Sequence, residues 1–240
     1  MKLYKALQSQ GFGSRKGCVA QVQAGRVEVN GMVCDDPEAE IDPVGLELTL
    51  DGVNWSYREK AYVLMHKPAG YECSHHPRHH PSVFALLPPP LVQRGVQCVG
   101  RLDQDTTGLL LFSDDGQFIH RMISPKKGVA KVYRASCADP LTDAMLDALR
   151  TGVQLNDEPA PIAALACESI DSHTLRLSLS EGKYHQVKRM IAATGNRVDS
   201  LHREAIGNYA LPASVLPGEW RWLDDDELKR LEQPWPSAMS

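Results

Sequence analysis

The segment from residue 100 to residue 112 constrains the fold more than any other part of the chain. It reads Gly-Arg-Leu-Asp-Gln-Asp-Thr-Thr-Gly over residues 100–108 and continues as Leu-Leu-Leu-Phe over residues 109–112. A short apolar run bounded by glycine predicts a buried strand. The charged residues before it predict a tight loop at the rim of a sheet, because a core would reject unpaired charges that a rigid edge can hold.

Several chemistries could use this loop. Its acids and threonine over residues 103–108 imitate the first half of a calcium-binding EF-hand, but the twelfth position is Asp114 rather than glutamate. The prolines at 88–90 also predict no helix upstream, where an EF-hand requires one. Three interpretations remain open at this point: a metal–nucleotide site, a catalytic carboxylate paired with a distant cation, and a turn whose acids cap backbone amides.

Charge is distributed unevenly along the chain. The net charge of −4 over 240 residues argues against general affinity for polyanions. However, residues 1–33 carry five lysines and arginines against one acid, and residues 35–51 carry seven acids and no base. Local fields guide the encounter with a charged partner, so the basic first segment predicts an anionic partner there.

The cysteines and the start of the chain indicate the compartment. The six cysteines form no C-x-x-C pair, and we expect reduced thiols in a cytoplasm. The N-terminal residues lack the apolar core of a secretory signal, and no apolar run reaches membrane-spanning length. The histidines within residues 75–80 lie beside prolines without acids or cysteines at ligand spacing, which favours a solvated loop over a metal site.

Residues 1–58 are expected to form a small first domain. Apolar spacing predicts two short helices around residues 3–11 and 14–22, with Ser14 as N-cap of the second. Asn30-Gly31 within an alternating stretch predicts a two-residue hairpin, and a further strand is expected near residues 46–50. The polar stretch at 51–60 is interpreted as the domain boundary.

Residues 59–233 are expected to form a second, larger domain, followed by a flexible tail at 234–240. Strands are predicted over residues 61–65, 109–112, 129–137, 174–179 and 197–202, and helices near 118–123, 187–193 and 225–231. Asp224 lies at the expected cap of the last helix. The irregular order of these elements predicts an α+β fold rather than a doubly wound sheet.

Two further basic clusters complete the pattern. Residues 180–190 turn at Gly182 and enter a helix with cations in its first turn, where they oppose the helix dipole. An anionic partner would remove that conflict, although the same cations could simply face solvent. Residues 126–134 interleave lysine and arginine with Tyr133, a pattern suited to RNA whose bases stack on rings.

Taken in order, these blocks resemble the RsuA-type pseudouridine synthases. The resemblance is carried by residues 100–110, by Lys131-x-Tyr133, by residues 181–190 and by Leu216-Pro217-Gly218-Glu219. Residues 1 to about 50 are similar to the S4 RNA-binding domain that precedes the catalytic domain in that family. The Thr-Thr-Gly that closes the first block and the residues over 202–207 are closer to the small-subunit enzyme than to its large-subunit relatives. The histidine-rich run at 75–80 departs from the pattern.

The resemblance implies a fold and an activity. It implies an S4-like domain of two helices and a β-hairpin, followed by a catalytic domain on a mixed, mainly antiparallel sheet with flanking helices. The implied reaction isomerises a uridine of 16S ribosomal RNA to pseudouridine without a cofactor or metal, in a cytoplasmic, bacterial enzyme that acts as a monomer away from membranes.

It also implies roles for particular residues. Asp103 is the essential carboxylate, Lys188 is its basic partner, and Tyr133 stacks on the target base after that base is flipped out. Asp105 is expected to be structural. The remaining residues are expected to contact RNA, and in the catalytic domain they are Arg101, Lys131, His185, Gln186 and Arg189. In the first domain they are Arg15, Lys16 and Arg26.

Two alternatives stay open at this stage. One is a synthase of the same family that acts on large-subunit ribosomal RNA. The other is a non-catalytic RNA-binding or ribosome-assembly protein, which would be expected to lack Asp103 or Lys188.

Overall fold

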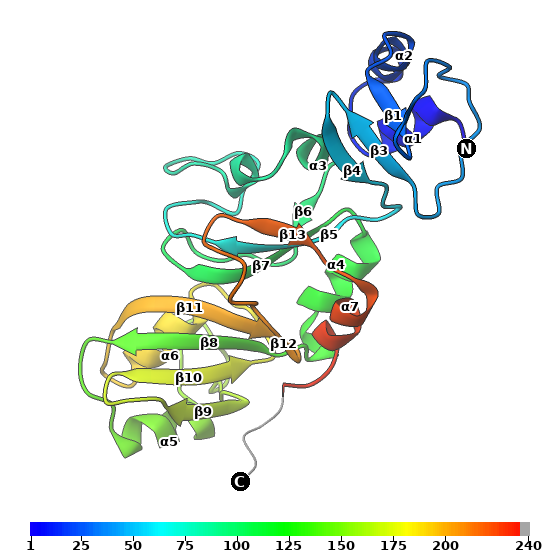
Figure 1. Ribbon diagram of the computed structural model, residues 1–240. Helices are drawn as coiled ribbons and strands as arrows, with labels where there is room; N and C mark the ends of the chain where they lie inside the picture. Colours follow the sequence, from blue (N-terminus) through cyan, green and yellow to red (C-terminus); the bar gives the residue numbers. More distant parts are fainter. Residues whose placement is uncertain (236–240) are drawn as a thin grey trace. The chain divides into compact units, whose positions relative to one another are not determined.

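The computed structural model describes residues 1–235, in two compact units (Figure 1). The first unit comprises Met1–Ala61 together with Leu87–Gln97, and the second comprises Tyr62–Leu86 and the chain from Cys98 onward. From residue 236, the tail expected at 234–240 lies outside the described residues. None of the helices formed by residues 1–235 combines the length and apolar character that crossing a bilayer requires.

The first unit packs short helices with a four-stranded antiparallel sheet. Its helices are α1 (Leu3–Ser9), α2 (Arg15–Gln23) and α3 (Pro89–Gln93). The sheet has the order β2-β1-β3-β4, with bounds Val27–Val29 for β1, Met32–Val33 for β2, Glu47–Leu50 for β3 and Val53–Ser56 for β4.

Turn and cap chemistry explains most of these boundaries. The hydroxyl of Ser14 accepts a hydrogen bond from the backbone N–H of Gly17 at 3.2 Å, which confirms the predicted N-cap of α2. Asn30 and Gly31 have φ angles of 50° and 81°, as the predicted hairpin between β1 and β2 requires. Asp51 and Gly52, at 53° and 79°, form a second such turn within the stretch interpreted as a boundary, which instead contributes β4.

The expectation that the prolines at 88–90 exclude a helix is wrong. Pro88 is the extended N-cap of α3, and Pro89 occupies its first position. The first turn of a helix has no internal acceptor for its N–H groups, so proline loses nothing there and brings a suitable φ angle. A Cβ on Gly11, whose φ is 88°, would lie 2.0 Å from the carbonyl oxygen of Pro90, so the turn between α1 and α2 closes directly onto α3.

The second unit is built on a nine-stranded mixed sheet with flanking helices, which confirms the predicted α+β class. Its main path has the order β13-β5-β7-β11-β8-β10-β9, in which only the contact between β7 and β11 is parallel. The strands are β5 (Tyr62–Lys67), β6 (Gln97–Cys98), β7 (Thr107–Ser113), β8 (Lys131–Cys137), β9 (Ala166–Ser169), β10 (Thr174–Leu179), β11 (Val198–Ile206), β12 (Tyr209–Ala210) and β13 (Trp220–Trp222).

Four α-helices and two 3-10 turns accompany this sheet. They are η1 (Val83–Leu86), α4 (Gly116–Ile123), η2 (Pro125–Lys127), α5 (Asp143–Thr151), α6 (Gln186–Ala193) and α7 (Asp225–Leu231). The predicted cap of α7 is confirmed: Asp224 accepts from the N–H of Glu227, and Glu227 accepts from the N–H of Asp224. The apolar spacing predicted for residues 118–123 is that of α4, whose Phe118 and Met122 are buried.

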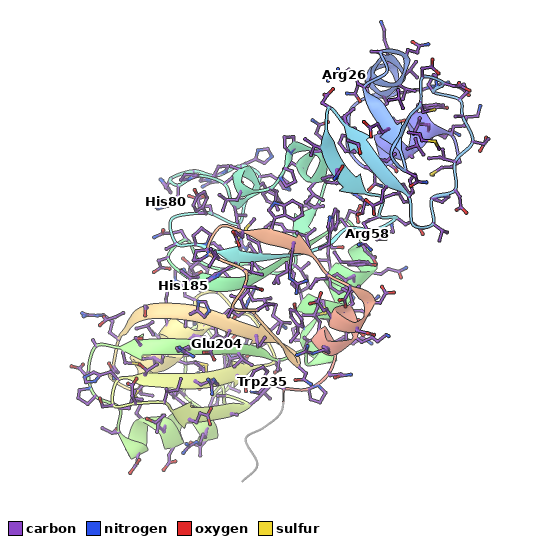
Figure 2. The ribbon with its side chains drawn as sticks, in the orientation of Figure 1. Arg26, Arg58, His80, His185, Glu204 and Trp235 are labelled. Atoms are coloured by element: carbon purple, nitrogen blue, oxygen red, sulfur yellow. The ribbon has the colours of Figure 1, made fainter. Side chains whose placement is uncertain are left out.

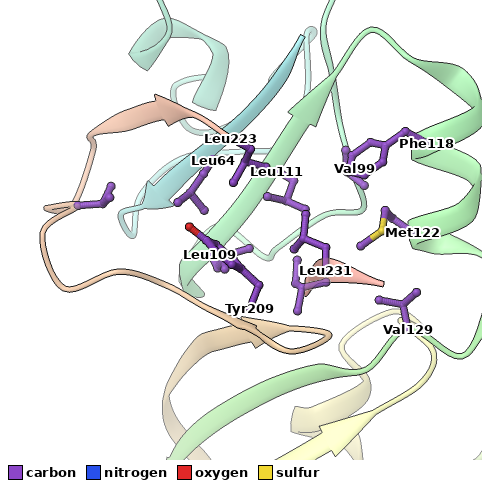
Figure 3. Close-up of a cluster of buried hydrophobic side chains, with 12 residues drawn as sticks. Leu64, Val99, Leu109, Leu111, Phe118, Met122, Val129, Tyr209, Leu223 and Leu231 are labelled. Atoms are coloured by element: carbon purple, nitrogen blue, oxygen red, sulfur yellow. The ribbon is translucent and has the colours of Figure 1, made fainter. Parts of the chain in front are cut away.

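Apolar side chains from β5 and β7 pack against α4 and α7 in the core (Figure 3). Leu64, Leu109 and Leu111 lie at the centre of this cluster, with Phe118 and Leu231 from the helices. The predicted buried strand is thus confirmed as β7, with its leucines fully buried. The polar loop before β7 is consequently fixed to the most rigid part of the unit.

Gly108 lets β7 lie directly against β11. Its φ is 109°, and a Cβ there would lie 2.3 Å from the carbonyl oxygen of Arg203. In the parallel register, Gly108 is opposite Arg203 and Thr107 is opposite His202. A side chain at position 108 would therefore push apart the two strands that carry the loop and the far half of the sheet.

Candidate active site

The loop over residues 100–106 is held in place by a buried lysine. Lys67, at the end of β5, is fully buried, and its Nζ donates to the carbonyl oxygens of Pro68 at 3.0 Å, Gln104 at 3.2 Å and Thr106 at 2.9 Å. Burial lowers its pKa, which the nearby acids of the loop partly oppose. Three carbonyl oxygens around one ammonium fix the backbone on both sides of the second acid.

Lys188, in the first turn of α6, contacts both acids of the loop. Its Nζ lies 3.2 Å from Oδ2 of Asp103, and 2.6 Å and 2.9 Å from the two carboxylate oxygens of Asp105. Burial alone would lower the pKa of Lys188, but the hydrogen bonds to Asp105 and Asp103 outweigh it and raise the pKa. Burial likewise opposes ionisation of Asp105, yet the bond from Lys188 leaves the pKa of that carboxyl lowered.

The expected pairing of Asp103 with Lys188 is therefore present, and Asp105 takes the shorter contacts. Asp105 is the more exposed acid, with a side chain 56% exposed against 27% for Asp103. The two carboxylates also explain how a cation is tolerated at the start of a helix, because their negative charge offsets the helix dipole there. Lys188 is thus anchored by Asp105 and presented to Asp103.

His185 approaches Asp103 from the opposite carboxylate oxygen. Its Nε2 lies 3.3 Å from Oδ1 of Asp103. His185 is the N-cap of α6 and has a φ of 47°, a left-handed backbone that costs a residue with a side chain about 1–2 kcal/mol. Its ring stacks on that of Tyr184, with centroids 3.8 Å apart. Strained backbone of this kind clusters at functional sites.

Asp103 lies in a cleft floored by the sheet. Tyr133 from β8 lines this cleft with Asp103, Arg101 and the apolar side chains of Leu179 and Leu201. Tyr133 is buried, whereas Arg101 is exposed at the edge of the loop. The carboxylate of Asp103, the ring of His185 and the ring of Tyr133 thus line one cleft, and Lys188 contacts Asp103 beside it.

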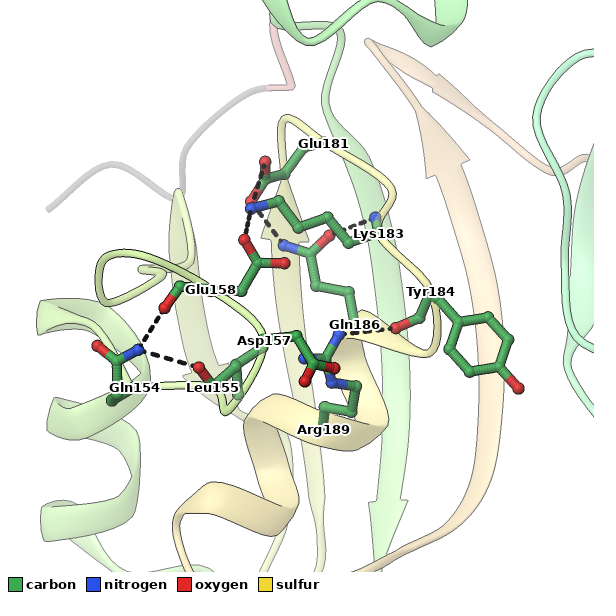
Figure 4. Close-up of polar contacts among 9 residues, drawn as sticks. All are labelled: Gln154, Leu155, Asp157, Glu158, Glu181, Lys183, Tyr184, Gln186 and Arg189. Carbon is green, nitrogen blue, oxygen red and sulfur yellow. Dashed lines mark hydrogen bonds and ion pairs between the residues drawn. The ribbon is translucent and has the colours of Figure 1, made fainter.

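The segment before α6 forms the outer wall of the cleft (Figure 4). Gln186 is 4% exposed, accepts from the backbone N–H of Lys183 at 2.9 Å and donates to Glu181 at 3.0 Å. The Nζ of Lys183 pairs with Glu158 at 2.5 Å. Gln186 was expected to contact RNA, but both ends of its amide are occupied by hydrogen bonds within this wall.

The other predicted RNA-contacting cations of the second unit differ in exposure. Arg189 pairs with Asp157 at 3.3 Å across the outer wall, and Figure 4 shows the ring of Tyr184 pointing away from that pair. Arg101 is exposed, whereas Lys131 is only 8% exposed. Lys131 consequently cannot act as a surface contact to an RNA backbone.

The predicted cations of the first unit are exposed on its surface. Arg15 and Lys16 lie in the first turn of α2, with the guanidinium of Arg15 5.0 Å from the ring centroid of Tyr4. Arg26, labelled in Figure 2, forms a two-point ion pair with Asp51. That pair raises the pKa of Arg26 and lowers the pKa of Asp51 through the hydrogen bonds between them.

The histidine-rich run at 75–80 is organised by one acid. The carboxylate of Glu72 accepts backbone N–H bonds from Arg78, His79 and His80, which lowers its pKa. The ring of His75 stacks on Phe84. Within residues 1–235, no group of three or more histidine, cysteine, aspartate or glutamate residues could hold a metal ion.

Lys67 was not predicted from the sequence, whereas Asp105 was expected to be structural and anchors Lys188. Lys67 is a charged residue at the end of a buried strand, immediately before Pro68. A charge in such a place is unfavourable unless it has partners, and this was the signal in the sequence that could have identified it. The anchoring of Lys188 by Asp105 depends on two segments 83 residues apart and has no local signal.

Comparisons with known proteins agree on one family. A family model described as RNA pseudouridylate synthase matches residues 61–193. The chain is 37% identical to a Yersinia pestis protein named ribosomal small subunit pseudouridine synthase A, over 98% of the chain and 99% of that protein. It is also 37% identical to a Bacillus subtilis protein named uncharacterized RNA pseudouridine synthase YtzG, with the same coverage. A crystal structure titled pseudouridylate synthase covers 96% of the chain and 99% of its own, at 33% identity and a TM-score of 0.68.

Proposed function

Because the chain belongs to the RNA pseudouridylate synthase family, we propose that it isomerises a uridine of 16S ribosomal RNA and that Asp103 is its catalytic carboxylate. An isomerase acting on RNA uridine is established by the family. The observation that supports the assignment of Asp103 is its contact with Lys188 and His185 in a cleft that His185 and Tyr133 also line.

The reaction exchanges one bond to the ribose for another. The N1–C1′ bond breaks, the uracil turns, and C5 bonds to C1′, so no oxidant or reductant is needed. Asp103 acts at the ribose as nucleophile or base through its carboxylate, and the ammonium of Lys188 lies 3.2 Å from one of its oxygens. Asp105 keeps Lys188 in position, and His185 restricts the other oxygen of Asp103.

The target uridine reaches Asp103 only after it leaves the RNA stack. Flipping a base costs a few kcal/mol, which stacking inside the enzyme has to offset. Tyr133 lines the cleft beside Asp103 and offers a ring for the flipped base. Arg101, exposed at the rim, is placed to contact a phosphate or to fill the space that the base leaves.

We propose that the first unit supplies RNA affinity in the manner of an S4 domain. Arg15, Lys16 and Arg26 are exposed cations that would contact phosphates with little base specificity. The double variant Arg15→Ala and Lys16→Ala is expected to bind RNA more weakly and to show a shallower salt dependence. Small-subunit RNA is favoured as substrate because several relatives carry that name over nearly their whole length. We further propose that the enzyme works in the cytoplasm as a monomer.

The decisive experiment measures tritium release from RNA labelled at C5 of uridine, because isomerisation removes that hydrogen. Wild-type protein is given transcripts of 16S and 23S ribosomal RNA, and Asp103→Asn is compared with it at saturating RNA. We expect release from 16S RNA and a loss of at least ~10³-fold in the variant, with RNA affinity within a few-fold.

The matched control is Asp226→Asn, which changes an exposed acid of α7 and should remain fully active. Release from 23S RNA alone would refute the small-subunit assignment in favour of a large-subunit synthase. An active Asp103→Asn variant would refute the role of that carboxylate.

A further inference from the structure

A second cavity adjoins the cleft that holds Asp103. It has a volume of about 80 Å³ and shares Arg101, Tyr133 and Gly182 with the cleft. Its other walls include Lys131 and Arg203. The ring of Tyr133 therefore has the carboxylate site on one side and this cavity on another.

Two buried cations line this cavity, and each has a nitrogen without an acceptor among the described residues. Lys131 is 8% exposed and Arg203 is 3% exposed. Among residues 1–235, no hydrogen-bond acceptor is found for Nζ of Lys131 or for Nη2 of Arg203. A buried charge whose hydrogen-bond donors are not all satisfied is costly, so two such cations side by side call for a ligand that supplies negative charge.

The strand register places both cations on the face of the sheet that carries Tyr133 and the cleft. Lys131 and Tyr133 are two residues apart on β8, so their side chains point to the same face of the sheet. Arg203 is directly opposite Tyr133 on β11. The Nε of Arg203 donates to the carbonyl oxygen of Leu109 at 2.7 Å, which fixes the guanidinium at the root of the catalytic loop. Both cations are thus held by strands and cannot swing out to solvent.

The shape and lining of the cavity exclude an RNA phosphate as its occupant. Val99, Met122 and Ile206 of the apolar core form part of its wall (Figure 3). A phosphodiester carries a sugar on each side and needs an open groove, whereas the edge of a planar base can enter a small enclosure. The base that stacks on Tyr133 presents such an edge.

We propose that this cavity receives the edge of the target uracil and that Lys131 and Arg203 stabilise the negative charge that develops on it. The proposal rests on the function given above. When the N1–C1′ bond breaks, its electron pair stays with the uracil and spreads over N1, O2 and O4. The carboxylate of Asp103 balances the positive charge that this leaves at C1′. C5 then gives an electron pair to C1′, loses its proton, and N1 gains a proton.

The protonation of Lys131 suits this role. Burial and the neighbouring Arg203 lower the pKa of Lys131 to about 8, so it still carries its proton at neutral pH. Charge stabilisation that exists only after bond cleavage accelerates the reaction without tightening substrate binding. Preorganised donors of this kind are worth about 10²–10³-fold in rate each.

The test compares Lys131→Met with wild-type protein in single-turnover reactions at saturating RNA. We expect a rate lower by about 10²-fold, as for loss of one preorganised donor, with RNA affinity changed only a few-fold. Lys131→Gln, which keeps hydrogen bonding without charge, should fall between them. Lys229→Met is the control, because Lys229 is an exposed lysine of α7 outside both cavities.

A second substrate separates charge stabilisation from a merely structural role. 5-Fluorouridine has no hydrogen at C5 to lose, so cleavage of its N1–C1′ bond is followed instead, as the disappearance of 5-fluorouridine from digested RNA. Its uracil anion is more stable, so the deficit of Lys131→Met in this step should be smaller than with uridine. A folded Lys131→Met variant with the wild-type rate, a loss confined to affinity, or an equal deficit on both substrates would each overturn the proposal. Wild-type protein inactive on ribosomal RNA would instead refute the proposed function, and this inference with it.

Discussion

Replacing Lys131 with methionine should make the protein more stable at neutral pH while it slows the reaction. Methionine matches the length of the lysine stem and removes a buried ammonium that has no acceptor among the described residues. Folding lowers the pKa of Lys131 from 10.5 to about 8. At about 1.4 kcal/mol for each pKa unit, keeping Lys131 protonated in the folded state lowers the free energy of unfolding of the wild-type protein by on the order of 3 kcal/mol.

The sign and the pH window follow from the same values. Between pH 8 and 10.5, the unfolded chain holds this proton and the folded chain does not, so wild-type stability rises with pH across that window. The advantage of Lys131→Met should therefore be full below pH 8 and should largely disappear near pH 10.5.

Urea unfolding at a series of pH values measures this difference. Three of the four tryptophans, Trp220, Trp222 and Trp235, belong to the second unit, so their fluorescence follows its unfolding. Lys229→Met, the exposed control, should shift the unfolding free energy by less than about 0.5 kcal/mol at every pH. A Lys131→Met protein less stable than wild type at pH 7, or a difference that does not depend on pH, would show that Lys131 has a stabilising partner and refute the reasoning.

Three further predictions concern other parts of the second unit. Gly108→Ala should destabilise the protein by about 1–3 kcal/mol, because its Cβ would meet the backbone of Arg203; unchanged urea unfolding would contradict this. The thiol of Cys98 hydrogen-bonds to Cys73 and lowers the pKa of Cys73, so iodoacetamide should label Cys73 with a rate midpoint below that of an ordinary thiol, and a midpoint above pH 8.5 would argue against it. The hydrogen bond from Arg221 lowers the pKa of Glu227 to about 2, so Glu227 stabilises the fold above pH 4.5 and ceases to do so as the pH falls towards 2. Acid unfolding of Glu227→Gln should lack this component of the pH dependence, and an unaltered acid transition would contradict it.

Local chemistry was the part of the fold that the sequence could predict. The cap at Ser14, the turn at Asn30-Gly31 and the cap at Asp224 each depend on residues within three or four positions. The apolar run before Ser113 identified the central strand β7 for the same reason. The Asp51-Gly52 turn carried an equally strong signal, but the polar residues around it concealed the strand that follows.

For the candidate site, sequence motifs could identify which residues take part but not what surrounds them. Asp103 and Lys188 were identified, and the structure brings their side chains to 3.2 Å. Their surroundings depend on strand register across the sheet, which no local pattern encodes. Lys131 illustrates this: among basic neighbours it resembled a surface contact, and only its place on β8 opposite Ile206 buries it.

Because the chain returns to the first unit at Leu87–Gln97, the protein cannot be divided into its two units by a single cut. The side chain of Arg94 donates to the carbonyl oxygens of Arg58 and Glu59, and the turn at Gly11 closes onto α3. A fragment that ends at residue 58 would lack α3, so the surface of the first unit that covers the fully buried Leu91 would face water. The N-terminal module therefore cannot be excised or grafted onto another enzyme as one continuous piece; its last helix has to travel with it.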